Sequence, residues 1–164
     1  MIIKRQVWFS PANQERTLHL YLPDDYEFSA ERYPVMYMFD GHNLFYDSDA
    51  TYGKSWGFKE FLDSWDKKII VAGIECSHEG NNRLKEYCPY YWNSGWAGEV
   101  YGTGDETMRW MAYDLKPMID AEYRTWSHRE ATGIGGSSMG GLMSLYAAIC
   151  YNNVYSKAAC VSSA

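Results

Sequence analysis

Several features that define other protein classes are missing from this sequence of 164 residues. No stretch reaches the roughly 18 consecutive apolar residues of a transmembrane helix. The first ten residues, MIIKRQVWFS, contain neither a continuous apolar segment nor a small-residue cleavage site, so they do not form a signal peptide. Lysine and arginine are scattered without a basic stripe, and the net charge is -6. We therefore expect no membrane and no nucleic acid as partner.

Metal and nucleotide motifs are missing as well. The sequence contains no HExxH or HxxEH pattern and no GxxxxGK[ST] loop, and its cysteines and histidines are not grouped as ligands. We therefore expect no metal and no cofactor. The four cysteines, Cys76, Cys88, Cys150 and Cys160, form no CxxC pair. They predict reduced, mostly buried thiols in a cytoplasmic protein, with a Cys76–Cys88 disulfide as the less favoured alternative.

Length and patterning predict one α/β domain over residues 1–164. With 46 % hydrophobic residues the chain can bury one sizeable core. Strands are expected at residues 4–10, 16–22, 33–40, 69–74, 131–136 and 157–163, and helices at 56–65, from about 103 to 119, and at 139–151. The first two strands form an antiparallel hairpin through a turn at Pro11. Later strands alternate with helices, which favours a mostly parallel sheet with helices on its faces.

The helical segments have apolar faces that we expect to point inward. Thr103 or Asp105 is a candidate cap of the second helix, and Pro117 predicts a kink or break inside it. Residues 77–104 form an aromatic insertion with little helical or strand periodicity. The inward positions are Phe58, Phe61, Leu62 and Trp65; Met108, Met111, Ala112, Leu115 and Ile119; and Leu142, Leu145, Ala148 and Ile149.

The segment GIGGSSMGGL carries a candidate nucleophile. Its residues 136–140 fit G-x-S-x-G with Ser138 at the centre, between a predicted strand and a predicted helix. Such a corner strains the central residue and needs small neighbours, which Gly136 and Gly140 provide. The alternative is a tight turn without chemistry. Ser138 is favoured over Ser137, which lies one residue away from the corner.

Three blocks of sequence resemble a known family. YPVMYMFDGHNLF, RLKEYCPYYW and IDAEYRTWSHREATGIGGSSMGGLMSLYAA are similar to the putative esterase family of α/β hydrolases, which includes esterase D, enterochelin esterases, and feruloyl and acetylxylan esterases. The resemblance covers nearly the whole chain from Val35 onward. It implies an α/β-hydrolase-type sandwich and a serine carboxylic-ester hydrolase that acts on a small-molecule ester.

The same resemblance implies roles for individual residues. Ser138 matches the nucleophile that forms an acyl-enzyme, and Met139 matches the residue whose N–H forms one arm of the oxyanion hole. Gly41 or His42 is the expected second donor, through its backbone. His42 is otherwise a substrate contact or an exposed loop residue. Whether the protein is a homo-oligomer stays open.

The aromatic insertion permits two interpretations. Its rings either form a platform that stacks on a sugar or phenolic ring, with Tyr91 and Trp92 as substrate contacts, or pack on the core without a ligand, which we favour. The rings concerned are Tyr87, Tyr90, Tyr91, Trp92, Trp96 and Tyr101.

The chain does not supply a complete catalytic triad in the order of the family. Residues 139–164 contain no Asp, Glu or His, and all four histidines, His19, His42, His78 and His128, precede Ser138. We expect the acid and the histidine on further strands of a longer parent protein, with the 164-residue chain alone almost inactive. The alternatives are an upstream base, an acyltransferase of the same fold, and a non-catalytic binding module on a hydrolase scaffold.

Overall fold

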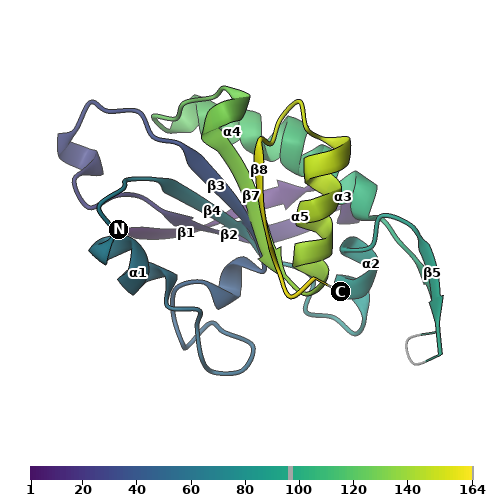
Figure 1. Ribbon diagram of the computed structural model, residues 1–164. Helices are drawn as coiled ribbons and strands as arrows, with labels where there is room; N and C mark the ends of the chain where they lie inside the picture. The colour runs from purple at the N-terminus through teal and green to yellow at the C-terminus, as the bar shows by residue number, and fades with distance from the viewer. Residues whose placement is uncertain (96–97, 164) are drawn as a thin grey trace.

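The computed structural model describes residues 1–95 and 98–163 and contains a six-stranded sheet in the order β1-β2-β4-β3-β7-β8 (Figure 1). The strands are β1 (Ile2–Phe9), β2 (Gln14–Tyr21), β3 (Val35–Phe39), β4 (Ile70–Ile74), β7 (Thr132–Ser137) and β8 (Lys157–Val161). β1, β2 and β4 pair antiparallel, whereas β4, β3, β7 and β8 run parallel. The predicted α/β fold with an N-terminal hairpin is confirmed.

The hairpin turn follows from its local sequence. Pro11 lies in a 3-10 turn (Ser10–Ala12), and Asn13 closes the turn with a left-handed φ of 52°. Asparagine tolerates this conformation better than most residues. The register then pairs Phe9 with Gln14 and Ile2 with Tyr21, so that β1 becomes one edge of the sheet.

The central strand β3 is covered on both faces. Side chains alternate along a strand, and accordingly Tyr37 and Phe39 join one core cluster while Met38 joins the other. The first cluster includes Met108 of the helix α3 (Gly104–Trp110) and Met143 of the helix α5 (Met139–Cys150). The second includes Leu62 of the helix α1 (Phe58–Ser64). Both faces therefore carry helices.

Pro117 marks an interruption in a long helical segment, as the sequence predicts. A π-helical turn (Met111–Leu115) separates α3 from α4 (Lys116–Glu122), and Pro117 lies in the first turn of α4. Proline has no N–H to donate to the preceding turn, so the bonding pattern shifts at this point. All five apolar positions predicted on this face are buried. Thr103 occupies the N-cap position but makes no side-chain capping bond.

The predicted inward face of α5 is wrong in part. Leu145 and Ile149 are exposed, and Ala147 and Met143 are buried instead. The helix lies close against β7 and β8 through its glycines: a Cβ added to Gly141 would lie 3.0 Å from the carbonyl oxygen of Val161. The small residues therefore decide which side of α5 faces the sheet. The predicted inward face of residues 56–65 is also wrong in part, because Leu62 is buried whereas Phe61 and Trp65 are exposed.

Two further expectations need correction. Residues 77–104 are not irregular throughout, because they contain the short helix α2 (Asn82–Glu86) and a hairpin of β5 (Tyr91–Ser94) and β6 (Gly98–Tyr101) that extends from the body of the molecule near α2 (Figure 1). All four cysteines are free, but only Cys76 and Cys88 are buried; Cys150 and Cys160 are exposed. Cys160 lies on the edge strand β8, whose residues are all exposed.

In the described ranges 1–95 and 98–163, no helix combines the length and the apolar character that a membrane span requires.

Candidate active site

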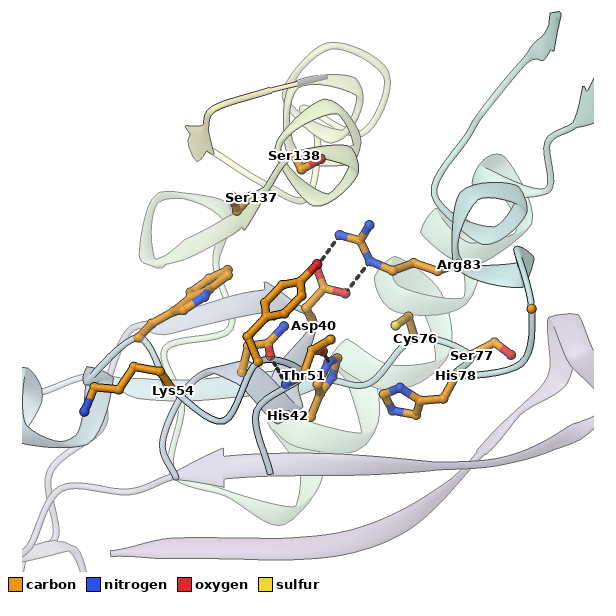
Figure 2. A pocket seen from close by; sticks show the side chains of 14 residues that line it. Asp40, His42, Thr51, Lys54, Cys76, Ser77, His78, Arg83, Ser137 and Ser138 are labelled. Carbon is orange, nitrogen blue, oxygen red and sulfur yellow. Dashed lines mark hydrogen bonds and ion pairs between the residues drawn. The ribbon is translucent and has the colours of Figure 1, made fainter. Parts of the chain in front are cut away.

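Three parallel strands end at the same edge of the sheet, and their following residues meet there. Asp40 follows β3, Cys76 lies two residues after β4, and Ser138 follows β7. Together with neighbouring loops they line a cavity of about 390 Å³ (Figure 2). Its lining consists of Asp40, His42, Asn43, Thr51, Tyr52, Lys54, Trp56, Cys76, Ser77, His78, Gly80, Arg83, Ser137 and Ser138.

Ser138 occupies the strained corner that the sequence predicts. Its backbone has φ 57° and ψ -122°, which a non-glycine residue rarely adopts. A Cβ on Gly136 would lie 2.7 Å from the carbonyl carbon of Gly140, so the corner closes only with glycine there. The Ser138 N–H donates to the carbonyl of Val161 at 3.0 Å, which anchors the corner to β8.

Met139 begins α5 immediately after this corner. The first N–H groups of a helix have no acceptor within the helix and carry the positive end of its dipole. The Met139 N–H is one of these groups. Ser137, in contrast, is the last residue of β7 and pairs with Val161, although it also lines the cavity.

A second cavity, of about 500 Å³, is also lined by Ser138 and is mainly apolar. Tyr91 and Trp92, the predicted substrate contacts, both line it, together with Met139 and Leu142. Ser138 and Arg83 line both cavities. The nucleophile candidate therefore lies where a polar and an apolar cavity meet.

Some rings of the aromatic insertion pack on the core, and others are exposed. Tyr87 is buried and packs edge-on against Phe39, with ring centroids 4.9 Å apart. Tyr90, Tyr91 and Tyr101 are exposed. Trp92 is partly buried against the core, and Trp96 lies outside the described residues.

Asp40 and Arg83 form an ion pair that the sequence reasoning missed. The Arg83 guanidinium donates from Nε to Oδ1 at 2.8 Å and from Nη2 to Oδ2 at 2.7 Å. Asp40 has a left-handed φ of 56°, and its N–H donates to the buried Tyr87 hydroxyl at 3.2 Å. The bond to Asp40 raises the pKa of Arg83 above its usual value. A signal was available in the sequence, because an aspartate directly follows a buried apolar strand and an arginine lies in the first turn of a short polar helix.

A second buried pair fixes the loop after β4. Arg16 of β2 donates to the Glu86 carboxylate of α2, with one contact at 3.2 Å, and Glu86 accepts the N–H of Ser77 at 3.0 Å. Both side chains are buried. This arrangement ties Ser77, in the loop after β4, to β2.

Gly41 and His42 lie in a 3-10 turn (Gly41–Asn43) that is pressed onto β4. A Cβ on Gly41 would lie 2.2 Å from the carbonyl oxygen of Gly73, so only glycine allows this approach. His42 is buried, and its Nε2 lies 2.9 Å from Thr51 Oγ1. Burial, followed by the neighbouring His78, lowers the pKa of His42. The alternative of an exposed loop histidine is thereby excluded.

Histidines and a cysteine that are not grouped in the sequence do form a group in the folded structure, so the expectation of no grouped ligands is wrong. The potential ligand atoms of His42, Cys76 and His78 all lie within 4.8 Å of one another. They come from the ends of β3 and β4, which are neighbours with Phe39 paired to Ile74. Parallel pairing therefore brings together residues that are more than thirty positions apart in the sequence.

Comparisons with known proteins identify the family of this chain. The model of the family described as putative esterase matches residues 10–164. This chain belongs to the putative esterase family. Among related sequences, it is 29 % identical over 137 residues to Esterase Rv1288 of Mycobacterium tuberculosis, covering 83 % of this chain and 26 % of the relative. It is 25 % identical over 151 residues to the protein YbbA of Bacillus subtilis, covering 90 % of this chain and 56 % of YbbA.

Solved structures of esterase-like proteins share the fold of this family member. An IroE-like serine hydrolase from Shewanella oneidensis superposes with a TM-score of 0.79 at 21 % identity, covering 99 % of this chain and 51 % of that one. The enterobactin esterase FES from Shigella flexneri gives a TM-score of 0.67 at 14 % identity, covering 94 % of this chain and 35 % of that one. This putative esterase chain thus spans little more than half the length, or less, of these relatives.

Proposed function

We propose that this chain carries the nucleophile and the oxyanion hole of a serine ester hydrolase that works through an acyl-enzyme. The family supports ester hydrolysis. The strained Ser138 corner, open to two cavities, is the observation that carries the assignment of the serine. A φ of 57° at a non-glycine residue costs conformational energy, and such strain is typical of functional positions.

In the proposed reaction, Ser138 Oγ attacks the ester carbonyl carbon and passes its proton to a general base. The carbonyl oxygen becomes an oxyanion, which accepts hydrogen bonds from the Met139 N–H and from the N–H of Gly41 or His42. The carbon–oxygen bond to the alcohol then breaks, and the alcohol leaves with the proton from the base. Water hydrolyses the remaining Ser138 ester in the same two stages and restores the serine.

The two cavities suggest how a small ester is held. We assign its apolar part to the cavity of Tyr91 and Trp92, whose aromatic surface suits such a group. Its polar part lies toward the cavity with Asp40 and Arg83. The ion pair with Asp40 fixes the position of the Arg83 guanidinium, which can donate hydrogen bonds to a polar group of the substrate.

We assign the general base to a part of the whole protein outside these 164 residues. Within residues 1–95 and 98–163, neither His42 nor His78 forms a hydrogen bond with Ser138; His42 Nε2 contacts Thr51 Oγ1 at 2.9 Å, and His78 Nε2 lies 3.1 Å from Glu75. In the family order, the acid and the histidine follow the nucleophile, and residues 139–164 contain neither.

The test is p-nitrophenyl acetate hydrolysis by the whole protein and by the 164-residue chain, with fluorophosphonate labelling of both. In the whole protein, Ser138→Ala should lower the rate at least about 1000-fold and abolish labelling. Ser137→Ala is the matched control and should remain active. Activity that survives Ser138→Ala but not Ser137→Ala would reverse the assignment. Turnover by the short chain that disappears in His42→Gln or His78→Gln would instead identify an upstream base.

A further inference from the structure

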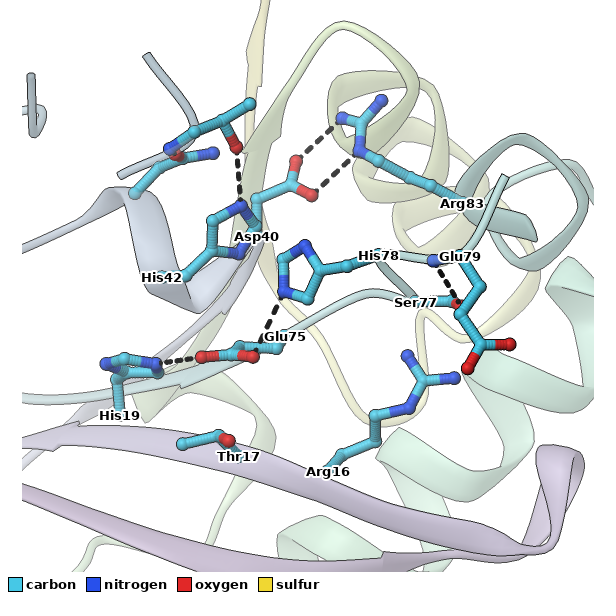
Figure 3. A network of polar contacts seen from close by, with 12 residues as sticks. Arg16, Thr17, His19, Asp40, His42, Glu75, Ser77, His78, Glu79 and Arg83 are labelled. Atoms are coloured by element: carbon cyan, nitrogen blue, oxygen red, sulfur yellow. Dashed lines mark hydrogen bonds and ion pairs between the residues drawn. The ribbon is translucent and has the colours of Figure 1, made fainter. Parts of the chain in front are cut away.

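Three potential metal ligands, His42, Cys76 and His78, line the polar cavity. His42 and Cys76 are buried, whereas the side chain of His78 is 57 % exposed. The rings of His42 and His78 lie nearly perpendicular, with centroids 4.6 Å apart (Figure 3). Neutral imidazole and thiolate are the ligand types that Zn²⁺ and its neighbours in the transition series prefer.

His42 presents a buried nitrogen that lacks a partner. Only 4 % of the residue is exposed, and Nδ1 has no hydrogen-bond partner among the residues that the structure describes. The other nitrogen, Nε2, lies 2.9 Å from the Thr51 hydroxyl. When Nε2–H donates to Thr51, Nδ1 is unprotonated, and its lone pair can coordinate a metal. Leaving such a buried nitrogen unsatisfied has a free-energy cost that a bound cation would remove.

His78 and Glu75 show the second feature of a metal site, a carboxylate behind the imidazole. His78 Nε2 lies 3.1 Å from Glu75 Oε2, and the other oxygen of Glu75 lies 2.6 Å from His19 Nε2. Figure 3 shows the Glu75 carboxylate between the two rings. A carboxylate that accepts one ring N–H fixes the tautomer and makes the other nitrogen a better ligand.

We propose that His42 Nδ1, Cys76 Sγ and His78 Nδ1 bind a divalent transition-metal cation of the Zn²⁺ class, with a fourth coordination position open to the cavity of Ser138. Tetrahedral coordination with bonds of about 2.0 to 2.3 Å requires ligand atoms about 3.3 to 3.8 Å apart. One ring nitrogen of each histidine and Cys76 Sγ lie within 4.8 Å of one another. Binding therefore requires a small approach of the ligand atoms, and the His78 side chain, which is 57 % exposed, is the ligand with room to move.

Binding exchanges one proton for the cation. The Cys76 thiol loses its proton to solvent, and the resulting thiolate forms the bond to the metal. Neither imidazole releases a proton, because both bind in the neutral form. No oxidant or reductant takes part.

The proposed metal ligands are side-chain atoms, whereas the proposed ester chemistry uses the Ser138 hydroxyl and backbone N–H groups of Met139 and of Gly41 or His42; both sets line one cavity. The ligands follow the ends of β3 and β4, whereas Ser138 lies between β7 and α5. In the view of Figure 2, Asp40 and Arg83 lie between Ser138 and the three ligands. Detection of a bound cation does not depend on catalysis.

The experiment is titration of the 164-residue chain with Co²⁺, followed by the near-ultraviolet thiolate-to-cobalt charge-transfer band, with Zn²⁺ added as competitor. We expect one equivalent of Co²⁺ to produce the band and Zn²⁺ to remove it. Cys76→Ser should abolish the band, and His78→Gln should weaken Co²⁺ binding at least about tenfold. Glu75→Gln should weaken binding about 10- to 100-fold without removing the band.

Matched controls separate this site from other thiols and histidines. Cys160→Ser and His128→Gln remove a thiol and an imidazole elsewhere and should leave the titration unchanged. Circular dichroism of each variant reports whether it is folded. If Cys76→Ser does not fold, His78→Gln still tests the site, because the His78 side chain is exposed. Absence of the band in the folded wild-type chain at millimolar Co²⁺ would overturn the proposal. Persistence of the band in Cys76→Ser, or unchanged affinity in His78→Gln, would do the same.

Discussion

Arg83 of α2 holds the carboxylate of Asp40, at the end of β3, through two parallel hydrogen bonds of 2.8 and 2.7 Å. The carboxylate is 3 % exposed and the guanidinium side chain 31 %. This pair therefore joins the short helix of the aromatic insertion to the central strand, directly beside the cavity of Ser138. Its geometry allows a bidentate contact that lysine cannot reproduce.

Removal of Arg83 should destabilise the fold, because it leaves the Asp40 carboxylate buried and unpaired. We expect Arg83→Ala to lower the free energy of unfolding by about 3 kcal/mol, measured by urea denaturation. The control is Arg129→Ala, which removes an exposed arginine beside Glu130. A surface pair of that kind contributes less than about 1 kcal/mol. Equal losses in the two variants would contradict the role given to the buried pair.

The glycine at the serine corner should not tolerate a side chain. In Gly136→Ala the new methyl group would meet backbone atoms of Gly140 at 2.7 to 2.9 Å, and neither backbone can withdraw. We expect a loss of about 1 to 3 kcal/mol in unfolding free energy, together with lower reactivity of Ser138 toward fluorophosphonate. Gly95→Ala is the control, since a Cβ there meets no atom of the described residues within 4 Å. A stable, fully reactive Gly136→Ala variant would be inconsistent with the close approach.

Two buried tyrosines should respond oppositely to loss of the hydroxyl. The hydroxyl of Tyr37 has no hydrogen-bond partner within residues 1–95 and 98–163, so Tyr37→Phe should be neutral or stabilising by up to about 1 kcal/mol. The hydroxyl of Tyr87 accepts the N–H of Asp40 at 3.2 Å, so Tyr87→Phe should cost about 1 to 3 kcal/mol. Thermal denaturation of both variants measures the difference. A destabilisation of similar size in both variants would contradict the hydrogen bonding described for the two hydroxyls.

Alkaline pH should destabilise the protein through its buried tyrosines. Burial raises the pKa values of Tyr37, Tyr87 and Tyr155 above the ordinary value of 10.0. Above that pH the unfolded chain loses these protons while the folded chain keeps them. Stability is therefore complete below pH 10.0 and falls as pH rises further, by up to about 1.4 kcal/mol per pH unit for each tyrosine. Urea midpoints across this range measure the slope, which should be smaller in Tyr155→Phe; a slope of zero would contradict the expectation.

The thiols should fall into two reactivity classes. Cys150 and Cys160 are exposed, whereas Cys76 and Cys88 are buried. Burial raises the pKa of Cys76 to about 12, so that its thiol stays neutral. With Ellman's reagent at pH 8, we expect two thiols to react rapidly and the other two only after denaturant is added. Cys150→Ser and Cys160→Ser should each remove one fast equivalent; four equally fast thiols would exclude the described burial.

Local patterns in the sequence were sufficient for much of the fold. The apolar run around Tyr37 predicts a strand covered on both faces, and the glycines around Ser138 predict the strained corner, because each depends only on neighbouring residues. The outward side of Leu145 and Ile149 could not be obtained in this way. It depends on how closely the glycines of α5 allow the helix to approach β8, which is a property of two distant segments.

The candidate site likewise has one part that is predictable from the sequence and another that depends on the tertiary structure. The sequence by itself determined the Ser138 turn, the helix that begins at Met139, and the family to which the chain belongs. Only the tertiary structure decided that Arg83 pairs with Asp40 and that His42, Cys76 and His78 form one group. The physical reason is the parallel register of β3 beside β4, with the Gly41 turn pressed onto Gly73: hydrogen bonds between strands, not proximity in the chain, bring these side chains to one edge of the sheet.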